Sequence, residues 1–193
     1  MTAPGQVKLA GDFETATAML SDEHRVILRV LDVMERLTQR PVPGALESWK
    51  KALDFARHFA DQCHHLKEER ILFPAMEAHG IPNEGGPIGM MLIEHEEGRS
   101  YVRSMFAAVA RAEANDEGAQ ESLVASAGGY IRLLREHIEK EDQVLFRIAD
   151  DVIPAEEQKQ LLRAFEDHEV GEMGTGIHEK YLAIVQMLET TVR

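Results

Sequence analysis

The stretch "HHLKEERILF" (residues 64–73) places histidines, carboxylates and apolar residues within ten positions, and it returns almost unchanged as "HIEKEDQVLF" (residues 137–146). The two copies agree at the first histidine, the lysine, the first glutamate and the closing Leu-Phe pair. A histidine and a glutamate four positions apart lie on one face of an α-helix. The repeat therefore predicts two helices that each present an imidazole and a carboxylate in one direction. The two pairs are His64 with Glu68 and His137 with Glu141.

An earlier histidine precedes each copy at nearly the same distance. His24, in "DEHR", lies 40 residues before His64, and His95, in "IEHE", lies 42 residues before His137. Both leading histidines follow a glutamate and lie on the apolar stripe of their own predicted helix. A period of about 72 residues corresponds to two helices and a loop, so we expect two halves related by a pseudo-twofold axis.

Helical spacing of apolar residues extends along nearly the whole chain, and the alternation typical of strands is absent. Helices are expected over 15–38, 46–79, 88–113, 119–152, 155–169 and 177–191. Four stretches rich in proline, glycine or turn residues and the single Pro154 separate them. Pro74 is expected to kink the second helix or to weaken its hydrogen bonding. These breaks are "QRPVPG" (39–44), "GIPNEGGP" (80–87), "NDEG" (115–118) and "VGEMGTG" (170–176).

The loops between the first four helices are short, and long helices joined in this way pack as antiparallel neighbours. The sequence therefore predicts an all-α fold in which an up-down-up-down four-helix bundle covers residues 12–153. The shorter segments form a C-terminal helical extension over residues 154–193, packed on the same domain.

Composition excludes several classes of function. The chain has 193 residues and a net charge of −13, which argues against binding to nucleic acid or to anionic membrane surfaces. No run approaches 18 apolar residues, and the first residues lack the basic-then-apolar order of a signal peptide. Cys63 is the only cysteine, which rules out an internal disulfide and a thiolate-rich metal site. We therefore expect a cytoplasmic protein.

The repeated residues predict a metal site inside the bundle. Two carboxylates buried without partners would cost several kcal/mol each unless a cation neutralises them. Two divalent ions bridged by Glu68 and Glu141 and flanked by histidines would do so. A single His–Glu pair is more often a solvated helix pair, but the duplicated pattern favours metal. A mixed imidazole and carboxylate set without thiolate suits iron or manganese, with zinc as an alternative.

The pattern "DEHR…HHLKEERILFP…GGPIGMMLIEHEEGR…HIEKEDQVLF" resembles the hemerythrin-like family of HHE cation-binding domains, from about Leu20 to Ile148. The resemblance implies a non-haem di-iron site, in which two iron ions are bridged by the two glutamates and by an oxo or hydroxo group. It carries the family's ligands over onto His24, His64, Glu68, His95, His137 and Glu141.

The sequence departs from the oxygen-carrying hemerythrins on the third helix. Those proteins have His-x-x-x-His there, whereas Met91 and Arg99 occupy the positions four away from His95. The resemblance then implies one imidazole fewer and a position open to an exogenous ligand, and we expect Arg99 to pair with an acid instead. Iron–sulfur-repair members of the family usually carry an additional N-terminal domain with a cysteine pair, and only about fourteen residues precede the first helix here.

Two register alternatives stay open. His65 and Glu69 form a second i,i+4 pair, rotated by about 100° from His64 and Glu68. Asp142 stands five residues after His137, which is the spacing of the bridging aspartate in the oxygen carriers. The repeat favours the first register, because only that one aligns both lysines and both Leu-Phe pairs.

Other residues invite chemical roles that the repeat does not include. Cys63 is expected to be a small buried hydrophobe, and Tyr130 either packs in the core or hydrogen-bonds a ligand. His168 and His178, in "FEDHEVGEMGTGIHEKY" (165–181), are expected to cap the bundle, with a second cation site as the alternative.

The predicted function is a di-iron protein that binds or senses oxygen, nitric oxide or peroxide. A di-iron redox enzyme or an iron-centre repair protein is one alternative, and an iron- or redox-responsive interaction module is another. The sequence leaves a protein partner open, as well as the choice between a monomer and a homodimer.

Overall fold

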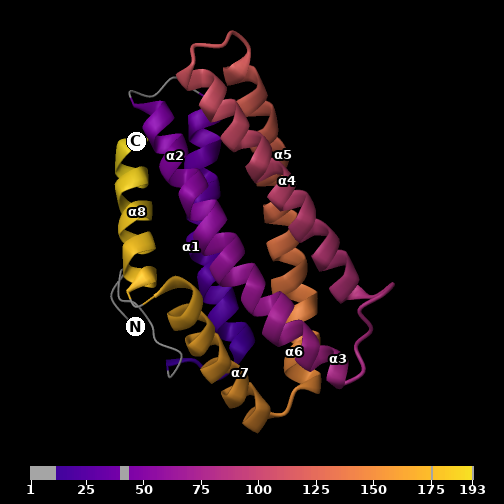
Figure 1. Ribbon diagram of the computed structural model, residues 1–193. Coiled ribbons are helices and arrows are strands. Elements are labelled where there is room, and N and C mark those ends of the chain that lie inside the picture. Colours follow the sequence, from indigo (N-terminus) through magenta and orange to yellow (C-terminus); the bar gives the residue numbers. More distant parts are fainter. Residues whose placement is uncertain (1–11, 40–43, 175, 193) are drawn as a thin grey trace.

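The structure is a computed structural model that describes residues 12–39, 44–174 and 176–192. All regular secondary structure in these ranges is helical, and none of their helices is long and apolar enough to cross a membrane. The first eleven residues, where a signal peptide was not expected, lie outside the described ranges. The all-α prediction is confirmed (Figure 1).

The first half of the repeat forms two long helical runs. The first run is α1 (Ala16–Gln39). The second contains α2 (Ala45–Phe55), the π-helical segments η2 (Ala56–His65) and η3 (Glu68–Leu72), and α3 (Phe73–Ala78). Both runs agree with the predicted ranges to within one residue at each end. Residues 40–43 of the "QRPVPG" break lie outside the described residues.

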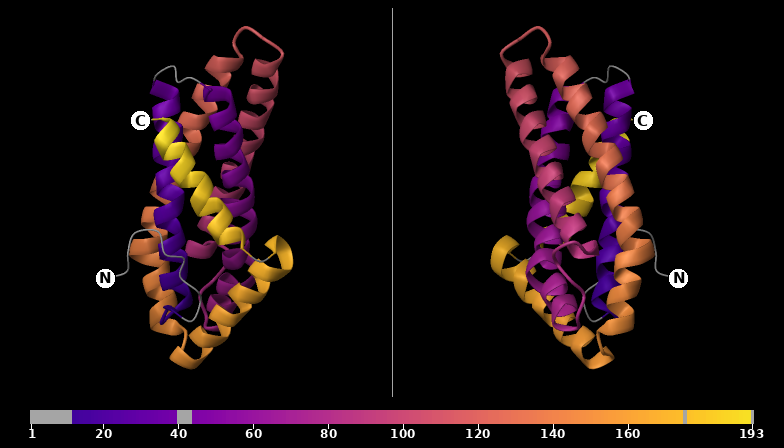
Figure 2. Two further views of the ribbon diagram at one scale, coloured as in Figure 1. Left: turned by 90° about the vertical axis from the view of Figure 1, so that its left-hand side faces the viewer. Right: turned by 90° about the vertical axis from the view of Figure 1, so that its right-hand side faces the viewer.

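The second half repeats this arrangement. It contains α4 (Pro87–Glu113), α5 (Ala119–Lys140), the π-helical segment η4 (Glu141–Leu145) and α6 (Phe146–Val152). The turn between α4 and α5 uses left-handed backbone at Gly118 (φ 91°), where glycine has no Cβ to clash. The long runs lie side by side in both views of Figure 2, with α4 against α5 and α1 against α5.

The C-terminal residues form α7 (Ala155–His168), the π-helical segment η5 (Glu169–Met173) and α8 (Ile177–Thr191). The expected break at 170–176 therefore begins later, because the helix continues as a π-helical turn to Met173. Figures 1 and 2 show α8 lying across one side of the long runs, where it contacts α1 and α2. The boundary between a bundle at 12–153 and an extension at 154–193 stays a prediction.

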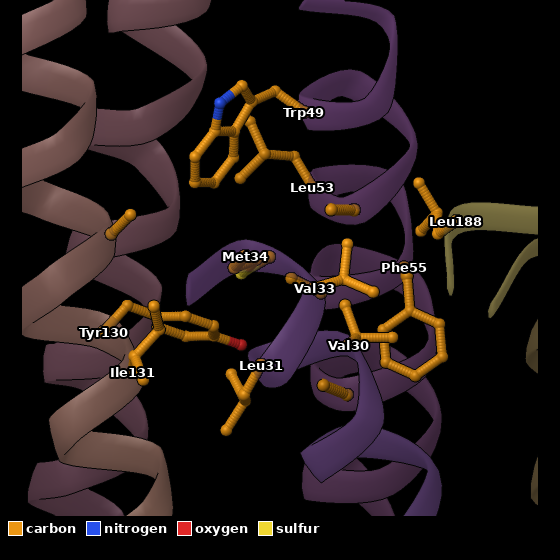
Figure 3. Close-up of a cluster of buried hydrophobic side chains, with 14 of the residues drawn as sticks. Val30, Leu31, Val33, Met34, Trp49, Leu53, Phe55, Tyr130, Ile131 and Leu188 are labelled. Atoms are coloured by element: carbon orange, nitrogen blue, oxygen red, sulfur yellow. The ribbon is translucent and has the colours of Figure 1, made fainter. Parts of the chain in front are cut away.

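Two separate hydrophobic clusters fill the interior. One cluster lies in the half of the molecule that contains α2 and α8. It includes the side chains drawn in Figure 3, where α1, α2, α5 and α8 meet. The labelled members are Val30, Leu31, Val33, Met34, Trp49, Leu53, Phe55, Tyr130, Ile131 and Leu188. The other cluster lies at the α7 end and is built around Leu20, Phe73, Met91, Phe146 and Phe165. Along each long run, buried histidines and glutamates lie at a polar level between the residues of the two clusters.

The π-helical segments lie at that polar level. Glu68 and Glu141 each open a five-residue π-helical segment, so the repeat extends to the backbone. Single π-helical turns within α-helices frequently occur at functional sites. Pro74 follows one of them, in the first turn of α3, where the missing backbone N–H matters least. The continuous helical run accommodates Pro74 through a change of hydrogen-bond pattern.

Candidate metal centre

The polar level contains two overlapping groups of side chains with metal-ligand chemistry. In the first group, the nitrogen and oxygen atoms of His24, His64, Glu68 and Glu141 all lie within 4.8 Å of one another. His24 Nε2 is 3.2 Å from Glu141 Oε2, and His64 Nε2 is 3.7 Å from Glu68 Oε1. All four residues are buried. This group joins α1 to the segments that carry the two copies of the repeat.

The second group consists of His65, Glu68, His95 and His137, again within 4.8 Å. His95 Nε2 is 3.4 Å from Glu68 Oε2, and His137 Nε2 is 3.3 Å from Glu141 Oε1. Glu68 and Glu141 therefore each turn one oxygen toward each group. This is the arrangement that two bridging carboxylates would need.

Most of the atoms that face the centre have no hydrogen-bond partner among the described residues, although His95 Nε2 lies 3.1 Å from His137 Nε2. Both oxygens of Glu68 and of Glu141 are buried and unpaired, as are Nε2 of His24 and both ring nitrogens of His65. Buried polar atoms in folded proteins are almost always paired, and an unpaired carboxylate is the most costly exception. The donor set therefore fits a group that is itself positively charged, and two cations placed between the carboxylates would satisfy it.

A carboxylate contacts the outward-facing nitrogen of both leading histidines. His24 Nδ1 is 3.0 Å from Asp142 Oδ1, and His95 Nδ1 is 2.7 Å from Glu69 Oε1. Asp142 and Glu69 occupy equivalent positions in the two copies of the repeat. Asp142 thus lies behind His24 and not between the two groups, and Glu141 provides the central carboxylate.

The repeat histidines have the same kind of partner. His64 Nδ1 is 2.8 Å from Glu23 Oε2, and His137 Nδ1 is 3.0 Å from Glu94 Oε2. These glutamates are the residues that precede each leading histidine in "DEHR" and "IEHE". The sequence signal was present, but a helix pattern alone does not show that a glutamate beside one histidine contacts the histidine of the next helix.

The lysines of the repeat complete the pattern. Lys67 donates a hydrogen bond to Glu23, and Lys140 donates one to Glu94. Each lysine therefore holds the glutamate that contacts a repeat histidine, and that histidine lies three residues before the lysine in the sequence. The aligned lysines, used only to fix the register of the repeat, have a positioning role in the structure.

His64 and His65 both face the centre, although sequence reasoning treats them as alternatives. The expected rotation of about 100° between neighbours holds for an α-helix, whereas both residues lie in the π-helical segment η2. A π-helical turn contains more residues, so consecutive side chains diverge by a smaller angle. The His65 ring stacks on His95 with the ring centroids 4.0 Å apart and the planes at 12°. The structure thus adds a fifth imidazole, His65, to the predicted set.

Arg99 pairs with acids, as expected for a guanidinium one turn beyond His95. Its Nε is 2.8 Å from Asp61 Oδ1, and its Nη2 is 2.6 Å from Glu69 Oε1. Since Glu69 also contacts His95, the arginine positions the carboxylate behind that imidazole. The fifth imidazole comes from His65 on the neighbouring helix and not from the position of Arg99.

Burial and charge set the protonation of the metal-free centre. Burial raises the pKa of Glu68 well above its ordinary value, and the Glu141 carboxylate raises it further. Burial lowers the pKa values of His64 and His95, so both imidazoles are neutral near pH 7. Burial also lowers the pKa of His24, but the carboxylates of Asp142 and Glu141, 3.0 and 3.2 Å from its two ring nitrogens, outweigh this and raise it to about 9. Metal binding would displace that proton.

The C-terminal residues contact the centre through Lys67. The Lys67 ammonium, fully buried, lies 2.9 Å from Glu169 Oε1, and Glu169 Oε1 lies 3.2 Å from His178 Nδ1. Glu23, Glu169 and His178 have metal-ligand spacing, but the lysine already supplies the positive charge between the two carboxylates. The alternative of a second cation site at His178 is therefore not favoured.

The remaining residues singled out in the sequence have structural contacts. Cys63 is buried and its thiol donates to Glu169 Oε1 at 3.4 Å, and burial raises the pKa of the thiol. His168 Nε2 is 3.0 Å from the backbone oxygen of Gln62, which fits the expected capping role. Tyr130 lies in the hydrophobic core (Figure 3).

Comparisons with known proteins agree with this geometry. The family model of the hemerythrin HHE cation-binding domain matches residues 15–149. An uncharacterized protein of Mycobacterium bovis is 31% identical over 162 residues, which cover 80% of this chain and 61% of the relative. Uncharacterized proteins of two Mycobacterium tuberculosis strains match with the same identity and coverage, so the chain spans about 61% of the length of these curated relatives. No solved structure matches. The chain belongs to the hemerythrin HHE cation-binding domain family.

Proposed function

We propose that the protein holds a non-haem di-iron centre that binds or senses a small molecule such as oxygen, nitric oxide or peroxide. One observation carries the proposal. Four carboxylate oxygens, from Glu68 and Glu141, are buried, accept no hydrogen bond from the described residues and lie between histidine Nε2 atoms on two sides. A compact site for two cations would match both the charge and the symmetry of this arrangement, which supports the proposal.

The proposed ligands are divided between the two groups. His24 and His64 would hold one ion, whereas His65, His95 and His137 would hold the other, with the two glutamates shared. Imidazole and carboxylate without thiolate suit iron, and manganese and zinc are the alternatives. When bound, the ions would supply Lewis-acid binding of a small molecule and a change of redox state.

The protein's own residues prepare the centre for that role. Carboxylates at the Nδ1 atoms of four histidines fix each ring's orientation and direct Nε2 toward the centre. Such partners of metal-binding histidines also increase the basicity of the ligand. Hydrophobic clusters on both sides exclude water along the long axis of the molecule. We also propose that the four long runs form the up-down-up-down bundle that this ligand arrangement requires.

Metal analysis combined with a spectrum tests the proposal. Protein produced with ample iron and purified without added metal should contain about two ions per chain, mostly iron. Its near-ultraviolet absorption should bleach with dithionite and return in air. Glu68→Gln should lose most of the metal, since it removes the charge that both groups share, while Glu97→Gln on exposed surface of α4 should keep it. A metal content no higher than background in the wild-type protein would contradict the proposal.

The contact between Lys67 and Glu169 favours a second candidate function, a metal-responsive interaction module. Glu23 contacts both His64 and Lys67, and Lys67 contacts Glu169 of the C-terminal residues. Metal occupancy at His64 would then influence how firmly α7 and α8 pack. Hydrogen exchange of α8 that is the same with and without metal would argue against this role.

A further inference from the structure

A cavity of about 260 Å³ opens to solvent between η2 and α4, beside the candidate metal centre. Its apolar wall is formed by Ala56, Gly98, Val102, Phe106 and Tyr130. Gly98 adds no side chain to this wall, and a Cβ added there would lie at ordinary contact distance from the side chains of Leu134 and Tyr130, 3.5 and 3.8 Å away.

The polar lining is positively charged, although the whole chain carries a net charge of −13. Three arginines and a single aspartate, Asp61, contribute to it. Arg99 is held by Asp61 and Glu69, and Arg103 by the exposed Glu96 at 2.9 Å. Arg57 is exposed and has no acidic partner in the part of the chain that the structure describes. The cavity therefore combines an apolar wall with an unpaired guanidinium.

The inner end of the cavity reaches the centre at one residue, His65. Neither ring nitrogen of His65 has a hydrogen-bond partner among the described residues, and the ring stacks on His95. The other four histidines of the centre do not line this cavity. The two halves of the repeat are thus unequal, because position 138, equivalent to His65, is an isoleucine.

We propose that this cavity binds a small organic acid, with its apolar body against Val102, Phe106 and Tyr130 and its carboxylate at Arg57. The volume suits a molecule larger than benzene, which fills a cavity of about 150 Å³, and an eight-carbon chain falls within that size. Arg103 forms a second contact for the carboxylate by exchanging its exposed partner Glu96. The relation of the bound acid to the metal rests on the proposed function, but the cavity itself does not.

Calorimetric titration with octanoate tests the proposal, in both metal-loaded and chelator-treated full-length protein. Octanoate should bind saturably with a Kd on the order of 1 mM or tighter, as expected for about ten non-hydrogen atoms. Acetate, which lacks the apolar body, and 1-octanol, which lacks the charge, should bind more weakly. Raised ionic strength should weaken octanoate binding, because the arginine is exposed.

Variants locate the binding. Arg57→Gln should weaken octanoate binding roughly fivefold, because that is about the affinity that one exposed ion pair contributes. Arg147→Gln, at another exposed arginine that has no acidic partner among the described residues, should leave binding unchanged. Val102→Trp should abolish binding by filling the cavity. Circular dichroism checks that the Val102→Trp variant folds. If that variant does not fold, the surface variant Arg57→Gln still tests the site.

The outcomes separate this proposal from the metal centre. Saturable binding that depends on Arg57 supports the cavity, even if metal analysis contradicts the centre. Absence of saturable octanoate binding to either form overturns the cavity, even if the protein contains two ions. Binding that persists unchanged in both Arg57→Gln and Val102→Trp also overturns it, because the acid then binds elsewhere.

Discussion

At the scale of single residues, the centre depends on carboxylates that do not face it. Glu69 shows this most clearly, because one oxygen, Oε1, contacts both His95 Nδ1 at 2.7 Å and Arg99 Nη2 at 2.6 Å. The guanidinium holds the carboxylate, and the carboxylate holds the imidazole. The same logic links Lys67 through Glu23 to His64.

Glu69→Gln should weaken metal binding about 10- to 100-fold, which is the usual effect of losing a partner of a metal-binding histidine. The amide keeps the shape of the side chain but cannot hold both the imidazole and the guanidinium. Competition with a chelator, followed by metal analysis, measures the change. Glu97→Gln, at an exposed position of α4, is the control, and equal metal affinity in both variants would show that the Glu69 contact has no positioning role.

At the scale of elements, the C-terminal helices are attached by charge as well as by apolar packing. Tyr181, Val185 and Leu188 of α8 enter the core, while Glu169 contacts both the buried Lys67 and His178. Lys67 has no exposed surface, so its charge depends on the carboxylates of Glu23 and Glu169.

Glu169→Gln should destabilise the protein by about 1–3 kcal/mol, since it removes one of the two carboxylates that pair with a buried ammonium. Urea unfolding followed by circular dichroism measures the free energy of unfolding. Glu166→Gln on the exposed side of α7 should change it by less than about 0.5 kcal/mol. A Glu169→Gln variant as stable as the wild type would contradict the charge-based attachment.

The contact between Glu169 and His178 predicts how the packing of α8 depends on pH. Burial lowers the pKa of His178, but its hydrogen bond to Glu169 and the nearby Glu23 outweigh this and raise it above 6.5. Burial raises the pKa of Glu169, but His178 and Lys67 outweigh this and lower it below 4.5. The His178 contribution is therefore complete below pH 6.5 and lost as pH rises through the raised pKa. The Glu169 contribution is complete above pH 4.5 and lost on acidification.

Protection of α8 should thus be greatest between about pH 4.5 and 6.5 and should decline on both sides. Hydrogen exchange, corrected for the intrinsic pH dependence of the exchange rate, measures it. Lys67 and Glu23 also face Glu169 and His178, so a variant is needed to isolate the effect of the histidine. His178→Gln should remove the decline in protection above pH 6.5. A decline that persists unchanged in His178→Gln would assign it to another group.

At the scale of the whole molecule, metal and fold should be coupled. The metal-free protein keeps unpaired carboxylates between two hydrophobic clusters, and ions that bind only the folded chain add stability. At free metal about 1,000-fold above Kd the gain is about 4 kcal/mol. Verified chelation should therefore lower the Tm by roughly 10 °C. The Glu68→Ala variant should remain helical and show no further change with chelator, whereas an unchanged wild-type Tm would contradict the coupling.

Much of this molecule could be read from its sequence. Periodicity placed the ends of the first four helical runs within one residue, because apolar stripes and Pro/Gly breaks are local properties of the chain. Duplication of His-x-x-x-Glu, with a histidine before each copy, identified the six residues that the structure brings together. Spacing on a regular helix is enough to predict which side chains share a face.

Other features depended on the tertiary structure. The π-helical turn that directs both His64 and His65 inward changes the residue period, so α-helical spacing could not predict it. The contacts of Glu23 with His64 and of Glu94 with His137 join different helices, and only the packing of one run against another decides them. The sequence determined which residues share a face of each helix, and the packing of the helices decided which of those faces meet.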